Sequence, residues 1–223
     1  MSNFREPKAI IDPIGNGSIT VEVFCHLHFV RNTHANYEST DATMKQSNAP
    51  NTVPRSLTPA LLEFCASISS VEPVFIPSVP IRRAATSFCF DNVAQKIREK
   101  GGSIAYGWAI WHLPGLYFEA EHHAVWRNKL GNLIDVSPQL GNRKRLLFLP
   151  DEGATYDPFA LRPNVMAPDG NSERARRMVA LGNRRHALLI RCRVPGTAEI
   201  RLYERDQLEL AEIDRQIWET RSG

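Results

Sequence analysis

Three side chains near the middle of the 223-residue chain have the types and order that thiol-dependent acyl chemistry uses. Cys89, His123 and Asp135 follow one another as cysteine, histidine and carboxylate. A thiolate attacks carbonyl carbon, an imidazole takes the proton of the thiol, and a carboxylate holds the imidazole in one tautomer. These residues are therefore predicted to form one site, provided that the fold brings them together.

The sequence around the cysteine favours a thiolate. Residues 86–102 predict a helix that starts at Cys89, places Val93 and Ile97 four residues apart, and ends at Gly101. A cysteine in the first turn of a helix lies near free backbone N–H groups and the positive end of the macrodipole, which both favour the thiolate. Cys25, Cys65 and Cys192 lack this setting and are predicted to be packed, reduced thiols.

The turn between the two strands that follow decides which histidine is the base. If the turn is the three-residue loop 129–131 with a left-handed glycine, Val125 faces Asp135 and His123 is the diagonal neighbour of the carboxylate. A four-residue turn would bring His122 onto that face instead. The sequence leaves both registers open.

Residues 86–150 resemble a known superfamily core. The segments SFCFDNV, EHHAVW and GNLIDVSP are similar to the catalytic core shared by papain-like cysteine peptidases and transglutaminase-like proteins. The resemblance implies an α+β fold in which a helix packs on an antiparallel β-meander. It also implies that Cys89 is the nucleophile, His123 the general base and Asp135 the orienting group.

The resemblance further predicts a substrate cleft and leaves its oxyanion donor open. The side chains expected to line this cleft are Tyr106, Trp108, Trp126 and His122. Arg83 stands where papain-like peptidases have a glutamine, so only the Cys89 N–H is assigned to the oxyanion. The spacing from His123 to Asp135 is also shorter than is usual in transglutaminases.

Two functions follow from these residues. One is a hydrolase or acyltransferase that cleaves an amide or ester bond of a peptide, protein or small amide through a Cys89 thioester. The alternative is a non-enzymatic module that binds peptide or nucleic acid on a degenerate papain-like fold, with His123 and Asp135 as a cross-strand polar pair. For nucleic acid, the candidate contacts are Arg174, Arg177, Arg184 and Arg185.

The remaining sequence predicts extensions on both sides of this core, within one compact domain. Residues 1–79 are expected to hold a strand at 19–30, a polar insertion at 31–56 and a short helix at 58–69; residues 80–150 hold the helix and four strands. Residues 151–223 are expected to begin with a loop to 172. An Arg-rich segment, a hairpin of 187–194 with 198–204, and a helix over 206–220 follow.

Composition sets the broad class of the protein. A hydrophobic fraction of 43%, a charged fraction of 23% and a net charge of +3 indicate a folded chain with no general attraction for polyanions. No long apolar run or signal peptide is recognisable, so a cytoplasmic protein without a membrane partner is expected. No cofactor is expected. His26, His28 and His34 form only a weak metal-ligand pattern, and no metal is expected either.

Overall fold

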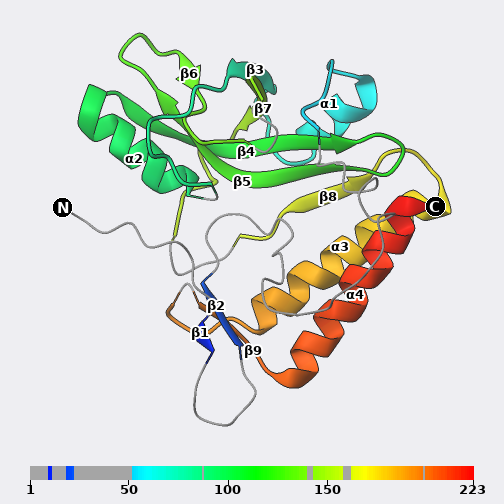
Figure 1. The fold of residues 1–223 in the computed structure, drawn as a ribbon. Coiled ribbons are helices and arrows are strands. Elements are labelled where there is room, and N and C mark those ends of the chain that lie inside the picture. Colours follow the sequence, from blue (N-terminus) through cyan, green and yellow to red (C-terminus); the bar gives the residue numbers. More distant parts are fainter. Residues whose placement is uncertain are drawn as a thin grey trace, which may run out of the picture.

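The computed structural model describes the backbone of residues 10–11 and 19–22, and residues 52–86, 88–139, 143–157, 162–197 and 199–223 in full. Most of the predicted 31–56 insertion, Cys25 and the histidines at 26, 28 and 34 lie outside these residues. The fold is α+β, and its larger sheet is antiparallel throughout (Figure 1). The helices in the described part of the chain are α1 (Pro59–Ala66), α2 (Cys89–Lys100), α3 (Glu173–Arg191) and α4 (Glu204–Ser222).

The larger sheet surrounds the long hairpin β4–β5. Its 6 strands have the order β3-β7-β4-β5-β6, with β8 also paired to β5. Their bounds are β3 Val74–Pro77, β4 Ser103–Leu113, β5 Tyr117–Arg127, β6 Leu133–Ile134, β7 Arg145–Pro150 and β8 Val165–Pro168. A 3-stranded sheet joins β1 (Ile10–Ile11), β2 (Ile19–Glu22) and β9 (Glu199–Leu202).

The predicted short helix is confirmed as α1, and its first turn shows why it forms. Thr58 is the N-cap residue, and its hydroxyl accepts a hydrogen bond from the Leu61 N–H at 3.3 Å. Pro59 occupies the first helical position, where its missing N–H costs nothing. Leu61, Phe64 and Cys65 are buried against Trp108 and Ile110 of the sheet, so α1 covers one face of β4.

The predicted start and end of the central helix are also confirmed. α2 begins at Cys89 and ends at Gly101, whose φ of 71° is accessible to glycine without strain. Val93 is fully buried in one cluster with Cys89, Ala124 and Val136. Burying this valine contributes about 1.5 to 3 kcal/mol, which fixes α2 against β5.

The four predicted strands do not form a simple meander. The segment expected over 133–139 contains only the two-residue strand β6, and the next strand, β7, pairs with β4 and β3 rather than with β6. Pro138 cannot donate to a ladder, and the chain after β6 turns back to hydrogen-bond Asp135. The edge of β5 beyond β6 is paired instead by β8, a strand inside the segment predicted as a loop.

The predicted C-terminal hairpin forms only next to its turn, where Val194 N–H donates to the Glu199 carbonyl oxygen and Arg201 N–H to that of Cys192, whereas the closing helix is confirmed. α3 continues to Arg191 through most of the segment expected as a strand, because its buried residues Leu181, Arg185 and Leu188 keep a helical period. β9 pairs with β2, and Arg193–Ile200 is an isolated bridge. α3 lies beside α4 below the larger sheet (Figure 1). Among the described helices, none has the length and apolar character needed to cross a membrane.

Candidate active site

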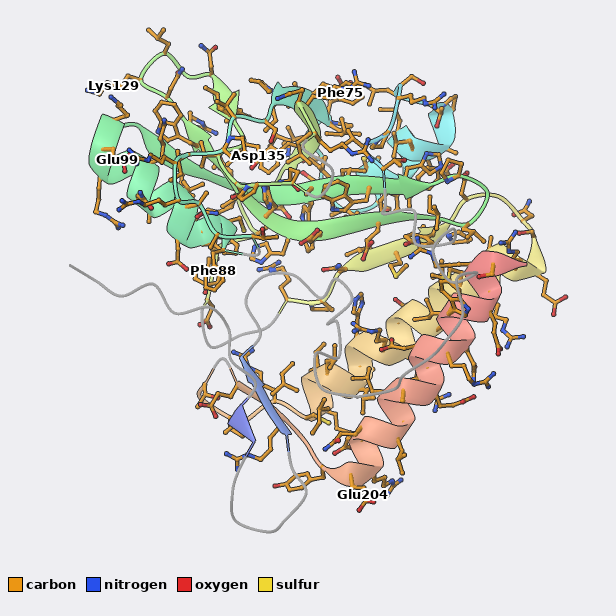
Figure 2. All side chains as sticks on the ribbon, viewed as in Figure 1. Phe75, Phe88, Glu99, Lys129, Asp135 and Glu204 are labelled. Carbon is orange, nitrogen blue, oxygen red and sulfur yellow. The ribbon has the colours of Figure 1, made fainter. Side chains whose placement is uncertain are left out.

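The structure brings the three predicted residues together. Cys89, His123 and Asp135 come from the start of α2, the middle of β5 and the residue after β6, and all have 0% exposure. The Nε2 atom of His123 lies 3.2 Å from the Oδ1 atom of Asp135. Cys89 lies close enough to the same imidazole to raise the pKa of His123. Figure 2 shows Asp135 within the sheet and Phe88 at the end of α2 where Cys89 begins the helix.

The turn has the three-residue form, and this selects the histidine. Trp126 pairs with Ile134, Asn128 N–H donates to the Asn132 carbonyl oxygen, and Gly131 has a φ of 86°. This is the three-residue register considered from the sequence, and it makes His123 the diagonal neighbour of Asp135. The alternative register, which would have used His122, is thereby excluded.

Asp135 is held by donors on both of its oxygens. Oδ1 accepts from the Ser137 N–H at 3.1 Å as well as from His123, and Oδ2 accepts from Ser78 Oγ at 2.9 Å and from Gln139 Nε2 at 2.7 Å. Burial raises the pKa of this carboxyl, but the hydrogen bonds from His123, Ser137 and Gln139 outweigh burial and lower it below its usual value. The carboxylate is therefore charged and fixed in direction.

The charge on His123 follows from its two neighbours. Burial of the ring lowers its pKa, yet the Cys89 thiolate charge, the hydrogen bonds to Asp135 and Cys89, and the Asp135 charge together hold the pKa well above its usual value. Because Asp135 accepts from Nε2, Nδ1 is the ring nitrogen that remains for the sulfur. The arrangement supports a thiolate–imidazolium pair with a carboxylate behind it.

His122 belongs to a different environment. Its Nε2 atom donates to the Ala154 carbonyl oxygen at 2.6 Å, and its ring lies 5.0 Å from the Phe90 ring and 5.7 Å from the Trp108 ring. Burial lowers its pKa, so the ring is neutral near pH 7. His122 thus packs against Phe90 and Trp108 and bonds Ala154 rather than Asp135.

The site lies where strand pairing on the outer edge of β5 is interrupted. β8 pairs with Tyr117 to Ala120, and β6 pairs with Trp126 and Arg127. Neither strand pairs with residues 121–125, which include His123. On the other side of β5, His123 faces Gly107, where an added Cβ would meet the Leu149 carbonyl oxygen at 2.2 Å. Only glycine fits there, so β4, β5 and β7 approach closely behind the imidazole.

The sulfur itself is enclosed. Cys89 packs in an apolar cluster with Phe90 and Val93, and the Phe90 ring stacks on Tyr156 with 3.9 Å between ring centroids. Tyr156 is 40% exposed, so this stack lies at the surface above the buried cluster. A substrate reaches the thiol only if side chains near Cys89 move.

The predicted cleft residues separate into two groups. Trp126 and Tyr106 pack against the Cys89 cluster, and Trp126 Nε1 donates to the Gly101 carbonyl oxygen at 2.8 Å. Trp108 lies in the cluster under α1, and its Nε1 donates to Asp151 at 3.0 Å. Arg83 is exposed with a φ of 66°, so it stands away from the buried carboxylate.

Ser78, Ser137, Gln139 and Asn92 support the site and were not identified from sequence. Gln139 and Ser137 stand within four residues of Asp135, a spacing that could have indicated them. Asn92, one turn after Cys89, bonds Ser137 Oγ at 3.1 Å and both backbone groups of Ala85. Ser78 reaches the site through β3, and nothing in its local sequence indicates this.

The arginines predicted as a nucleic-acid face mostly contact α4. Arg174 donates to the carbonyl oxygens of Thr220 and Arg221, Arg184 pairs with Glu209, and the buried Arg185 pairs with Asp214 at 2.8 Å. Arg177 is exposed. These contacts join the two helices, so the four side chains do not form one open basic row.

The described residues contain no group of three or more histidine, cysteine, aspartate or glutamate side chains placed to hold a metal ion. Comparisons with protein-family models, with curated proteins and with solved structures each found no match. The geometry of the site is therefore the basis for assigning a function.

Proposed function

We propose that this protein is a thiol-dependent hydrolase or acyltransferase that acts on an amide or ester bond. Cys89 is the nucleophile, His123 the proton carrier and Asp135 the group that orients the imidazole. The observation that carries the proposal is the coupling of His123 to Cys89 on one side and to Asp135, at 3.2 Å, on the other. The resemblance of residues 86–150 to papain-like and transglutaminase-like cores agrees with this assignment.

A structural role alone accounts poorly for so many polar groups in one buried place. Asp135 has four donors, and the imidazolium that it orients compensates its charge. Burying such a pair costs several kcal/mol per ion, and an apolar pair of similar volume would serve packing at least as well. Perturbed pKa values of coupled groups at the start of a helix are typical of a reaction site.

The proposed reaction begins with the thiolate already formed. The Cys89 sulfur attacks the carbonyl carbon, the C–S bond forms, and the π electron pair moves to the carbonyl oxygen. When the tetrahedral intermediate collapses, the C–N or C–O bond breaks and the His123 imidazolium gives its proton to the leaving amine or alcohol. The products of this half-reaction are a thioester on Cys89 and a neutral imidazole.

The second half-reaction regenerates the thiolate. The neutral His123 takes a proton from water or from an acceptor amine as that molecule attacks the thioester carbonyl, and the thiolate departs. The start of α2 places the positive end of its macrodipole at Cys89, which stabilises both the thiolate and an oxyanion formed beside it. Water gives hydrolysis, and an amine gives acyl transfer.

The test is to find the acyl group. The full chain is incubated with p-nitrophenyl acetate, quenched in acid within seconds, digested and analysed by mass spectrometry, with Cys89→Ala and Cys65→Ala variants in parallel. We expect a burst of nitrophenol and an acetyl group on the peptide that contains Cys89, in the wild type and in Cys65→Ala. An equal burst from Cys89→Ala, or no acetyl group on Cys89 in a folded wild type, would refute the proposal.

A further inference from the structure

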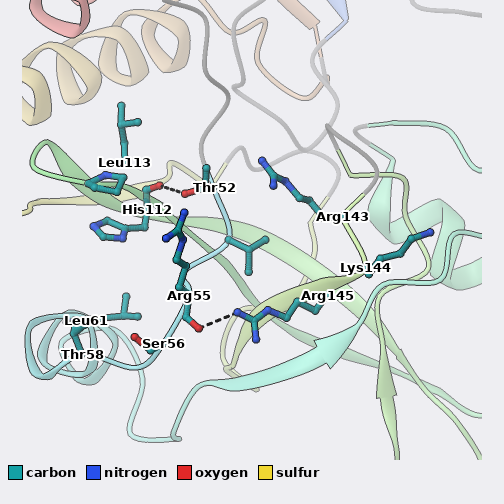
Figure 3. Close-up of a pocket in the computed structure, with 12 residues that line it drawn as sticks. Thr52, Arg55, Ser56, Thr58, Leu61, His112, Leu113, Arg143, Lys144 and Arg145 are labelled. Atoms are coloured by element: carbon teal, nitrogen blue, oxygen red, sulfur yellow. Dashed lines mark hydrogen bonds between the residues drawn. The ribbon is translucent and has the colours of Figure 1, made fainter.

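A second site lies at the other end of the β4–β5 hairpin. A pocket of about 700 Å³ is enclosed by the segment before α1, the β4–β5 turn and the start of β7 (Figure 3). The residues that line it are Thr52, Val53, Arg55, Ser56, Thr58, Leu61, His112, Leu113, Pro114, Arg143, Lys144 and Arg145. His112 is five residues along β4 from Gly107, the partner of His123. Five strand residues span about 17 Å, so this pocket is separate from Cys89.

The charged side chains that line the pocket are all basic. The lining includes three arginines and a lysine, together with the hydroxyls of Thr52, Ser56 and Thr58, and it includes no aspartate or glutamate. The chain as a whole is nearly balanced in charge, so this concentration is local. Cations facing a pocket repel one another unless an anion joins them, and such a pocket attracts anionic ligands.

The arginines of the pocket differ in their hydrogen bonds. Arg145 is engaged by the protein: its guanidinium donates to the carbonyl oxygens of Pro54 and Arg55, and it lies 4.1 Å from the centre of the Phe75 ring. Arg143 is different, because its Nε is buried and has no hydrogen-bond partner among the described residues. Figure 3 shows the guanidinium ends of Arg55 and Arg143 turned toward the Thr52 side of the pocket, whereas the Lys144 amino group points away.

We propose that this pocket binds a phosphate monoester, with the phosphoryl group between Arg55 and Arg143 and a compact apolar group against Leu113 and Val53. A guanidinium offers paired N–H donors that match phosphate oxygens, and the guanidinium ends of Arg55 and Arg143 are turned toward the same side of the pocket. The Ser56 hydroxyl supplies a further donor for a group with three terminal oxygens, whereas the Thr52 hydroxyl already donates to the His112 carbonyl oxygen. Leu113, Pro114 and Val53 provide the apolar wall.

Titration calorimetry of the full chain with phenyl phosphate, in 0.15 M salt at pH 7.5, tests this proposal. Inorganic phosphate and benzoate are titrated as comparison ligands, to separate the phosphoryl contribution from the apolar one and from a carboxylate. We expect saturable binding in the order phenyl phosphate, phosphate, benzoate. Because two charge-assisted contacts are involved, Arg143→Gln and Arg55→Gln are each expected to weaken phenyl phosphate at least about tenfold.

Lys144→Gln is the matched control. It removes one positive charge from a residue that lines the pocket, but the amino group of Lys144 points away from the proposed phosphoryl position. The affinity of this variant for phenyl phosphate is expected to stay within about twofold of the wild type. Circular dichroism melts of all variants identify any that fail to fold, and Arg143→Lys then serves as the milder second variant. The proposal is overturned if the wild type shows no saturable binding, or if Lys144→Gln weakens binding as much as Arg143→Gln. Tighter binding of benzoate than phenyl phosphate would overturn it too.

Discussion

Two buried cysteines on two helices have opposite surroundings. Cys65 of α1 is 1% exposed among Leu61, Phe64 and Trp108, and burial raises the pKa of its thiol to about 11. Cys89 of α2 is 0% exposed, and it is coupled to a histidine whose pKa is raised by the thiolate and by Asp135. Both helices cover the same sheet, and neither cysteine takes part in a disulfide.

The comparison shows that burial alone leaves a cysteine inert. In an apolar cluster the thiolate is not solvated, so the proton stays on the sulfur. At Cys89 the same loss of water is offset by an imidazolium, which in turn is stabilised by a carboxylate with four donors of its own. The proposed chemistry thus depends on His123 and Asp135, which β5 and the segment after β6 bring to the start of α2.

The largest expected effect is a difference in alkylation between the two thiols. With iodoacetamide at pH 7 and 25 °C, Cys89 should react at least about 100-fold faster than Cys65, because a thiol of pKa about 11 is almost entirely protonated there. Peptide mapping over time measures both rates in one sample. Equal rates for the two thiols in the folded protein would contradict the comparison, and would favour the binding-module alternative.

Removal of the His123 imidazole should make Cys89 nearly as unreactive as Cys65. We expect His123→Gln to slow alkylation of Cys89 and its acetylation by p-nitrophenyl acetate by about 10²- to 10⁴-fold, since the thiolate loses its counter-charge. His122→Gln is the matched control, because that ring bonds Ala154 and should change the rates less than about tenfold. A larger loss in His122→Gln than in His123→Gln would show that His122, and not His123, is the base.

Asp135→Asn should lower both the reactivity of Cys89 and the free energy of unfolding. We expect a smaller fall in Cys89 reactivity than in His123→Gln, and a loss of about 2 kcal/mol of unfolding free energy at pH 7, because buried donors lose a charged acceptor. The folded-state pKa of Asp135 lies below its ordinary value of 3.8, so its contribution is present above that pH and lost as the pH falls. Urea melts at pH 7 and pH 3 should show the wild-type advantage shrink in acid; a constant advantage would count against a charged Asp135.

The smallest expected effect concerns access to the sulfur. Tyr156→Ala removes the ring that stacks on Phe90 beside Cys89, and an aromatic pair contributes about 0.5 to 1.5 kcal/mol. If opening of this stack admits reagents, alkylation of Cys89 should become about two- to tenfold faster. Tyr156→Phe keeps the stack and should match the wild type; an unchanged rate in Tyr156→Ala would show that reagents enter elsewhere.

Local sequence was sufficient to predict much of the site. The start of α2 at Cys89 and its end at Gly101 follow from helical spacing and a terminal glycine. These signals act over a few residues, so they are readable without the rest of the fold. The three-residue turn with a left-handed Gly131 was one of two registers that the sequence allowed, and the structure selects it, which joins His123 to Asp135.

Long-range pairing could not be read in the same way. The segment of β7 has the pattern of a strand, and the predicted meander placed it beside β6, whereas it pairs with β4 and β3. The strand predicted over 187–194 failed because Leu188 and Leu189 suit a buried helix face as well as a strand. Burial against α4 and β9 decided between them.

The sequence by itself determined which residues could react and where the cysteine helix begins, because dihedral preferences and hydrogen bonds of neighbouring residues control these features. Only the tertiary structure decided that Ser78 and Gln139 would hold the carboxylate, that the sulfur would be enclosed, and that Arg55 and Arg143 would line one pocket. Those outcomes depend on contacts between segments far apart in the chain, whose free energy appears only once the whole core is packed.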